Sequence, residues 1–206
     1  MGIFSKAKTL VSPATGKVVL VTDVTDTVFK DNILGDGIAV IPEANEIVAP
    51  CDGKIVQIAH TKHAICIETP DGLELLLHLG MDTVNLNGEG FECFVNTGDN
   101  VKAGQKIMNM DINFIKEKGY GIESPCIITN LDNIKSFDCI TGTAEKGETV
   151  VIKSKVWFYM KNDILTEICC GSVNDCITAE KCGGDRIELV CAHFLGGLTP
   201  TSGVLH

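Results

Sequence analysis

Short apolar runs separated by turn residues make up most of the chain. From Ser12 onward, β-branched segments alternate with Gly, Pro, Asn or Asp at intervals of roughly 8–12 residues, which is typical of an all-β sandwich or barrel. A weak internal repeat supports this prediction, because segments 12–19 and 49–56 share a Pro-x-x-Gly-Lys turn that leads into an apolar strand. One short helix is predicted at 111–118, where Asp111 offers an N-terminal cap. We therefore expect an all-β, antiparallel sandwich with one or two short helices.

Residues 61–80 predict a β-hairpin. Two apolar arms flank Thr69-Pro70-Asp71-Gly72, and each arm carries one histidine, His63 or His78, at its far end. Pro presets the backbone for the first central position of a turn, Asp suits the second, and Gly accepts the positive φ that follows. The two histidines are the candidate functional residues of this hairpin.

The register of the hairpin decides whether the two histidines meet. A two-residue loop places His63 directly opposite His78, with Cβ atoms about 5 Å apart. A three-residue loop ending at Gly72 shifts the pairing by one residue and puts the histidines on opposite faces. The apolar pattern mildly favours this second register, because it sets the isoleucines at 65 and 67 beside the leucines at 75 and 77. A further bulge could bring the histidines back together.

The first eleven residues have a different pattern. Residues 1–11 place apolar side chains at helical spacing, with Lys6 and Lys8 on the other side. This pattern predicts a short basic amphipathic helix that rests on an anionic membrane surface or docks on its own domain.

Composition narrows the range of functions. The 206 residues carry a formal net charge of −10, and 45% of them are hydrophobic, which is enough for a sizeable core. The negative charge argues against nucleic acid, because there is no basic patch to neutralise phosphates. No run reaches the ~18 apolar residues of a membrane span, and no signal peptide with a cleavage site is visible. We therefore expect a cytoplasmic protein with reduced cysteines.

Two other functions use a similar β architecture. Segment 98–107 resembles the turn of lipoyl or biotinyl carrier domains, but Met108-Asn109-Met110 lacks their modified lysine, so only their barrel-sandwich-hybrid architecture is carried over. Lysostaphin-like zinc peptidases use a His-x-His motif, whereas His78-Leu79-Gly80 supplies one histidine. A catalytic zinc site usually needs three protein ligands. A zinc peptidase is thus the weaker alternative, and no intrinsic metal is expected.

Several motifs together resemble a known family. They are Asp36-Gly37-Ile38-Ala39, Val48-Ala49-Pro50-Cys51-Asp52-Gly53, Thr61-Lys62-His63-Ala64, Leu77-His78-Leu79-Gly80-Met81-Asp82-Thr83-Val84, Gly88-Glu89-Gly90-Phe91 and Gly98-Asp99-Asn100-Val101. Through them, residues 12–152 resemble the glucose-type enzyme IIA component of the bacterial phosphoenolpyruvate-dependent sugar phosphotransferase system. Residues 1–11 are similar to the membrane-contacting segment of its stand-alone members.

The resemblance implies a phosphotransferase component that carries a phosphoryl group in sugar uptake. His78 matches the histidine that accepts phosphate from the histidine-containing phosphocarrier protein and donates it to the cysteine of a sugar-specific IIB domain or IICB permease. His63 matches a second histidine that supports the transfer, and Thr61 and the backbone at Gly80 match positions that orient the two rings. A shared site favours the opposed register, with a bulge or an irregular turn near 70–72. A neutral imidazole is a competent nucleophile, and phosphoryl transfer needs mainly positioning.

The same resemblance implies a docking surface around the histidines. Val28 and Phe29 match hydrophobic contact positions, and Asp26 and Asp82 match acidic positions that face an arginine on the phosphocarrier. In relatives, the two histidines can also hold zinc when a partner supplies a carboxylate. The alternative function is a regulatory module that binds permeases or kinases. The sequence does not indicate which sugar is transported.

The last quarter of the chain lies outside the family pattern. Segment 163–178 is faintly similar to the start of a IIB domain, but Ala179-Glu180-Lys181 replaces the basic residues expected there. The Gly-, Thr- and Pro-containing end at 198–203 is typical of disorder. The expected parts are an amphipathic segment at 1–11, a phosphocarrier domain at 12–152 and a C-terminal extension of unknown role at 153–206.

Overall fold

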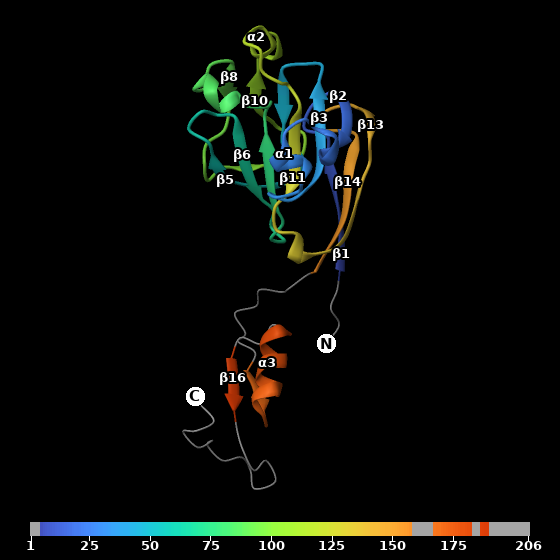
Figure 1. Ribbon diagram of the computed structural model, residues 1–206, viewed down its shortest axis with the longest axis vertical. Coiled ribbons are helices and arrows are strands. Elements are labelled where there is room, and N and C mark those ends of the chain that lie inside the picture. The colour runs from blue at the N-terminus through green and yellow to red at the C-terminus, as the bar shows by residue number, and fades with distance from the viewer. Residues whose placement is uncertain (1–4, 158–166, 183–185, 190–206) are drawn as a thin grey trace. The chain divides into compact units, whose positions relative to one another are not determined.

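The computed structural model describes residues 5–157, 167–182 and 186–189 (Figure 1). The chain divides into two compact units, Met1–Phe158 and Tyr159–His206, and each is considered by itself. In the first unit the described strands pair only in antiparallel fashion, as the turn-punctuated apolar pattern predicts. Its strands are β1 (Ser5–Val11), β2 (Gly16–Leu20), β3 (Asp36–Pro42), β4 (Glu46–Val48), β5 (Gly53–Ile58), β6 (Ala64–Glu68), β7 (Glu74–His78), β8 (Phe91–Cys93), β9 (Asn100–Val101), β10 (Lys106–Met110), β11 (Ser124–Ile128), β12 (Ile134–Cys139), β13 (Gly142–Ala144) and β14 (Val150–Trp157).

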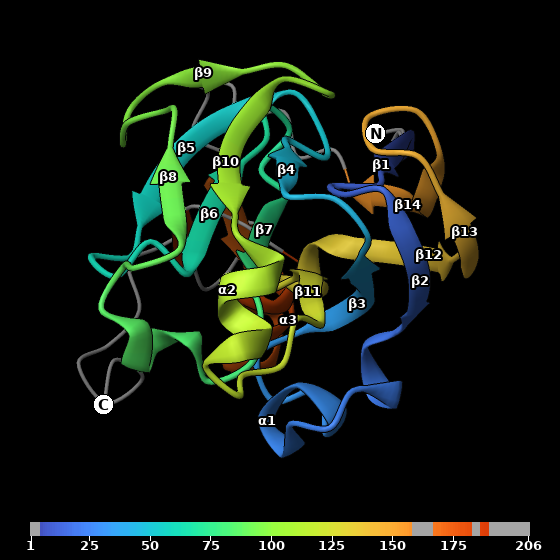
Figure 2. The ribbon, with the colours of Figure 1, turned by 90° about the horizontal axis from the view of Figure 1, so that it is seen from above.

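The strands of the first unit form three sheets. The largest runs in the order β13-β2-β3-β11-β7-β6-β5-β9, and the two smaller sheets run β4-β10-β8 and β1-β14-β12. Figure 2 shows β8 and β10 crossing in front of β5 and β6. Ile65 and Leu77 of the large sheet belong to the same buried cluster as Met108 of β10 and Leu10 of β1. The apolar faces of the sheets therefore close on one core, and the fold is an antiparallel β-sandwich.

Short helices lie between the strands. They are α1 (Thr27–Lys30) and α2 (Ile112–Glu117), with 3-10 turns η1 (Val21–Asp23), η2 (Thr83–Leu86) and η3 (Leu131–Asn133). The predicted helix near 111–118 is confirmed as α2, and the Asp111 carboxylate accepts a hydrogen bond from the Phe114 amide at 3.0 Å. This contact satisfies one of the amides that a helix leaves unpaired at its N-terminus.

The N-terminal helix predicted at 1–11 is not formed in the described part of that segment. Residues Ser5–Val11 are strand β1, which pairs with β14 from Ser5↔Trp157 to Val11↔Val150. The apolar spacing of the segment suits a helix, but a long-range partner strand outweighs local periodicity by pairing with β1 along its length. Residues 1–4 lie outside the described residues. The partner strand β14 continues beyond residue 152, where the family pattern was expected to end.

The second unit has a different architecture. Its described elements are β15 (Glu167–Cys170), α3 (Val173–Lys181) and β16 (Arg186–Leu189). The two strands are parallel, in the register Glu167↔Arg186 to Cys170↔Leu189, with α3 as the connection between them. The predicted disorder at 198–203 concerns residues outside the described part. Within the described residues, no helix is both long and apolar enough to cross a membrane.

Candidate functional site

The hairpin β6–β7 has the register that the apolar pattern favours. Ala64 pairs with His78 and Glu68 with Glu74, so the loop is the three residues Pro70-Asp71-Gly72, with Gly72 at φ +79°. The Leu73 carbonyl accepts from the Thr69 amide at 2.9 Å and closes this loop. The opposed register of His63 and His78, with a compensating bulge near 70–72, is therefore wrong. It would turn the buried isoleucines and leucines of the two arms to the wrong face.

The two histidines nevertheless meet. Their ring centroids lie 5.0 Å apart, with an interplanar angle of 76°. His63 precedes β6 and follows Lys62, a non-glycine residue at φ +56°. The His63 carbonyl still accepts from the Leu79 amide at 2.7 Å, so the arm stays paired while its backbone leaves strand geometry. The irregularity that unites the rings thus lies at the histidine end of the hairpin and not at its turn.

Each ring is fixed through its Nδ1 atom. Thr61 Oγ1 lies 2.6 Å from Nδ1 of His63, and the Gly80 carbonyl oxygen lies 2.8 Å from Nδ1 of His78. A carbonyl can only accept, so Nδ1 of His78 carries the hydrogen and the lone pair of the neutral ring resides on Nε2. Within the described residues, Nε2 of neither ring makes a hydrogen bond. The structure thus brings together all four residues predicted for the centre of the site.

The Gly80 carbonyl is held by groups that sequence reasoning missed. Gly80 has φ +75°, and a Cβ built on it would lie 2.6 Å from Cγ2 of Thr83 and 2.7 Å from the Gly121 carbonyl. Its amide donates to Ser124 Oγ at 3.2 Å, and Thr83 Oγ1 donates to the Leu79 carbonyl at 2.6 Å. Ser124 and Thr83 are buried polar residues among apolar neighbours, which is the pattern that could have indicated them.

Burial keeps both rings neutral. It lowers the pKa of His63, and it is also the main cause that lowers the pKa of His78. The nearby His63 lowers the pKa of His78 further. The Gly80 carbonyl, Asp26 and Asp82 raise this pKa, but the net change is a decrease. At neutral pH the free Nε2 lone pair of His78 is therefore available for attack on an electrophile.

The four predicted docking residues take different positions around His78. Val28 is 40% exposed, whereas Phe29 is buried and packs its ring edge-on against His78 at a centroid distance of 5.0 Å. The Asp26 carboxylate caps α1 by accepting from the amides of Val28 and Phe29. Asp82 is exposed at φ +57°, next to η2. Phe29 thus packs against the His78 ring, and Asp26 caps the helix that carries Phe29.

Other exposed apolar side chains adjoin these residues in the chain. Val84 of η2 is 46% exposed, and Ile33 and Leu34, which follow α1, are 69% and 42% exposed. Sequence reasoning missed them because an apolar residue in a connecting segment carries no periodicity to interpret. Together with Val28 they are exposed apolar side chains of the segments around α1 and η2, and these four residues (Val28, Ile33, Leu34 and Val84) are called the candidate docking surface.

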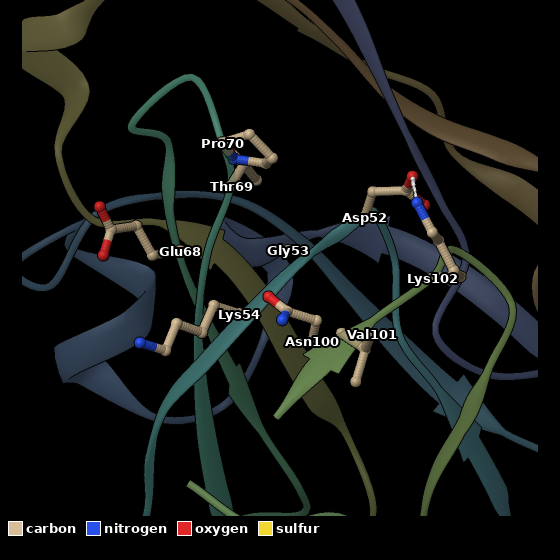
Figure 3. Close-up of a pocket in the computed structure, with 9 residues that line it drawn as sticks. All are labelled: Asp52, Gly53, Lys54, Glu68, Thr69, Pro70, Asn100, Val101 and Lys102. Carbon is tan, nitrogen blue, oxygen red and sulfur yellow. Dashed lines mark hydrogen bonds and ion pairs between the residues drawn. The ribbon is translucent and has the colours of Figure 1, made fainter. Parts of the chain in front are cut away.

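One hollow of the first unit lies away from the histidines. It measures about 480 Å³ and is lined by residues from the turn end of the hairpin, including Thr69 and Pro70, together with Asp52 and Lys102 (Figure 3). Lys102 Nζ donates to Asp52 at 2.8 Å, and both side chains are solvent-exposed. No histidine lines this hollow. The exposed charges of Lys102 and Asp52 are paired and screened by solvent, so they would attract a charged ligand only weakly. The two histidines lie at the other end of the hairpin, away from this hollow.

Comparisons with known proteins agree with this geometry. The model of the family described as phosphoenolpyruvate-dependent sugar phosphotransferase system, EIIA 1, matches residues 8–134. The chain belongs to this family. The matched range contains both histidines and the sheet that holds them, so the family membership extends to the candidate site.

Individual relatives show how much of the chain is shared. The glucose-specific EIIA component of Bacillus anthracis is 44% identical over 154 residues, which cover 74% of this chain and 93% of that protein. The glucoside-specific EIICBA component of Staphylococcus carnosus is 46% identical over 141 residues. The matched residues cover 68% of this chain and 20% of that longer protein. The solved structure of glucose permease IIA from Mycoplasma capricolum superposes with a TM-score of 0.68 at 40% identity, covering 74% of this chain and 99% of that one.

A second family model matches the other unit. The CutC family model matches residues 164–206, a range that contains the parallel strands and helix of the second unit. The faint similarity of segment 163–178 to a IIB domain thus falls in a region that matches a different family. The ranges matched by the two family models do not overlap.

Proposed function

We propose that the first unit carries a phosphoryl group on His78 in sugar uptake. The observation that carries this proposal is the pair of adjacent imidazoles, each anchored through Nδ1 and each with its Nε2 free. A family of sugar phosphotransferase components supplies the reaction class. The donor is the histidine-containing phosphocarrier protein, and the acceptor is the cysteine of a IIB domain or IICB permease.

Two displacements at phosphorus carry the phosphoryl group through His78. Nε2 of His78 attacks the phosphorus of the donor phosphohistidine, a new P–N bond forms, and the donor ring leaves with the electron pair of the broken P–N bond. The Gly80 carbonyl retains the proton on Nδ1 of His78 and fixes the ring in the attacking tautomer. In the second half-reaction a cysteine thiolate of the IIB domain attacks phosphorus, and His78 leaves as a neutral imidazole.

His63 stabilises the charge that develops on the phosphoryl oxygens. When the Thr61 hydroxyl donates to Nδ1 of His63, the ring hydrogen resides on Nε2 and can donate to a phosphoryl oxygen. Such a donor contributes most when charge builds up in the transition state, and its position is set before the reaction begins. His78 is thus the phosphoryl acceptor, and His63 acts on the transferred group.

The candidate docking surface receives the two protein partners. Exposed Val28, Ile33, Leu34 and Val84 offer an apolar contact area, and Asp82 offers negative charge at its edge. We assign the acidic role toward a phosphocarrier arginine to Asp82 before Asp26, because the Asp26 carboxylate already accepts two backbone hydrogen bonds. Contact of residues 1–11 with a membrane surface is also part of the proposal, but without a helix at 5–11.

We propose that the reaction needs no zinc, because a neutral imidazole is itself the nucleophile. Within the described residues, no group of three or more histidine, cysteine or acidic side chains gathers in a way that could hold a metal ion. We propose that His63 and His78 bind zinc only when a partner supplies a carboxylate. A chelator should then leave phosphoryl uptake by the isolated protein unchanged.

The decisive experiment is phosphorylation with phosphoenolpyruvate, enzyme I and the phosphocarrier. The wild-type chain should take up one acid-labile phosphate, and His78→Ala should take up none. His63→Gln should accept phosphate but donate it poorly to a IIB domain. His60→Gln is the matched control, because His60 is exposed in the same loop and should be dispensable. Acid-labile phosphate on the His78→Ala variant would refute the proposal.

A further inference from the structure

The peptide group between Leu79 and Gly80 is held at both ends by side-chain hydroxyls. Its carbonyl accepts a hydrogen bond from Thr83 Oγ1 at 2.6 Å, and its amide donates to Ser124 Oγ at 3.2 Å. Ser124 Oγ in turn donates to the Ile122 carbonyl at 3.0 Å, so its lone pairs remain available for the Gly80 amide. Thr83 and Ser124 are 0% and 1% exposed, so bulk water does not reach either hydroxyl.

The next peptide group, between Gly80 and Met81, carries the carbonyl that faces His78. This carbonyl oxygen lies 2.8 Å from Nδ1 of His78, and the Met81 amide donates to the Gly121 carbonyl at 2.9 Å. The two peptide groups share Gly80, which has φ +75°. Glycine can adopt many backbone conformations, so the position of its carbonyl depends on the partners that hold both peptide groups. Two hydroxyls hold the first group, and a backbone contact holds the second.

We propose that Thr83 and Ser124 are positioning residues for phosphoryl transfer through His78, a role that rests on the proposed function of that histidine. Their hydroxyls keep the Gly80 carbonyl against the His78 ring, so the ring hydrogen stays on Nδ1 and the lone pair on Nε2. Without one of the hydroxyls, Gly80 can move and the ring can place its hydrogen on Nε2. In that tautomer Nε2 has no lone pair for attack on phosphorus.

Two substitutions of Thr83 separate its hydroxyl from its methyl group. A Cβ on Gly80 would lie 2.6 Å from Cγ2 of Thr83, so the methyl group also packs close to Gly80. Thr83→Val keeps the shape and loses the hydroxyl. We expect it to lower kcat for phosphate uptake about five- to tenfold, the equivalent of one neutral hydrogen bond, with the KM for the phosphocarrier unchanged. Thr83→Ser keeps the hydroxyl and should retain the wild-type kcat. The opposite order would show that Thr83 acts by packing and would overturn its role.

Ser12→Ala is the matched control for Ser124→Ala. Ser12 is 0% exposed, and its hydroxyl donates to the Ala14 carbonyl at 2.7 Å and not to a group that holds Gly80. Each substitution leaves a buried carbonyl without its donor, so both variants should unfold at a lower urea concentration. Only Ser124→Ala should lower kcat for phosphate uptake, again about five- to tenfold. Equal values of kcat in the two variants would overturn the role of Ser124.

Nitrogen NMR of the full chain measures the His78 tautomer without any phosphoryl transfer. At about pH 8, above the ordinary histidine pKa of about 6.5, the ring is neutral, and comparison with His78→Ala assigns its signals. Nδ1 should carry the hydrogen in the wild-type chain, in Thr83→Ser and in Ser12→Ala. Thr83→Val and Ser124→Ala should show a mixture of both tautomers. Wild-type ring signals in these last two variants would overturn the proposal. Absence of phosphate uptake by the wild-type chain would instead refute the proposed function, so the two failures are distinguishable.

Discussion

The two ends of the β6–β7 hairpin use their polar groups in opposite ways. At the turn end, Thr69 Oγ1 donates to the Asp71 carboxylate at 2.5 Å and accepts from the Leu73 amide at 2.9 Å. The same carboxylate accepts from Lys8, and the Gly72 carbonyl accepts from Asn130 at 2.7 Å. At the other end, the histidine rings are each anchored by one nitrogen, and the second nitrogen has no partner within the described residues. One end is satisfied internally, whereas the other keeps hydrogen-bonding capacity for a phosphoryl group.

This comparison shows where stability and function separate. The turn end closes the hairpin and ties it to β1 through Lys8, so changes there should alter the free energy of unfolding. At the histidine end, both rings are partly buried, and this burial lowers the pKa of each ring. Changes there should alter phosphoryl transfer first. Matched substitutions at the two ends test this division.

Two glycines with similar positive φ, one at each end of the hairpin, should differ most in the effect of substitution by alanine. Gly80 and Gly72 have φ +75° and +79°, but a Cβ on Gly80 would collide with Thr83 and the Gly121 carbonyl, whereas a Cβ on Gly72 would meet nothing within 4 Å. We expect Gly80→Ala to cost about 2–5 kcal/mol in free energy of unfolding and to abolish phosphoryl uptake. Gly72→Ala should cost about 1–2 kcal/mol, with uptake intact. Urea unfolding and the phosphorylation assay measure both, and equal losses of stability would contradict the contrast.

The ion pair between Lys8 and Asp71 should stabilise the turn end alone. Their side chains are only 16% and 11% exposed, so Lys8→Met leaves a largely buried carboxylate without its cation. We expect a loss of about 1–3 kcal/mol in the free energy of unfolding, measured by urea titration. Lys102→Met is the control, because Lys102 and Asp52 are 80% and 51% exposed, and it should leave the unfolding midpoint unchanged. Similar losses in the two variants would remove the special role of the buried pair.

Two threonines offer a finer test. Thr61→Val removes the hydroxyl that lies against Nδ1 of His63, so the ring can adopt either tautomer. We expect donation to a IIB domain to slow about tenfold, the equivalent of one neutral hydrogen bond. Thr69→Val removes a hydroxyl of the same kind from the turn and should lower stability by about 1 kcal/mol without slowing donation. Rapid-quench measurement of phosphoryl donation separates the two, and normal donation by Thr61→Val would exclude Thr61 from the site.

The hairpin also shows how far sequence reasoning extends. The apolar pattern predicts the observed register because Ile65, Ile67 and Leu77 are all buried in one core. The meeting of the histidines was not predictable from that pattern, since it depends on Lys62 at φ +56°, a conformation that lysine does not favour. The resemblance to a family predicted the meeting but attached it to the wrong register.

The prediction for the N-terminal segment was wrong for a related reason. Local spacing predicts a helix at 1–11, but β1 is stabilised by a partner strand near the other end of the unit. Local periodicity carries no information about so distant a strand. Asp111 and the helix α2 were predictable because a cap and its helix are adjacent in sequence. What the sequence reveals here is local chemistry and burial, and what it conceals is long-range pairing and single left-handed residues.

The smallest effect is a pH dependence that differs between the two ends. Burial lowers the pKa of His63 and His78, so below the ordinary value of about 6.5 the unfolded chain binds protons that the folded rings do not. Stability should therefore fall as the pH drops through that value, and the loss should level off below the folded pKa. At the turn, burial alone would raise the pKa of Asp71, but hydrogen bonds from Lys8 and Thr69 prevail and lower it.

The contribution of Asp71 is consequently present above its ordinary pKa of about 3.9 and is lost at more acidic pH, as the carboxylate takes up a proton. The double variant His63→Gln, His78→Gln should lose the decline that begins as the pH falls through about 6.5 and keep the one below about pH 4. Asp71→Asn should do the reverse. Urea unfolding midpoints across this range measure both windows. If the double variant kept the full decline near pH 6.5, the rings would not be neutral through burial, and the proposed nucleophile would lose its electrostatic basis.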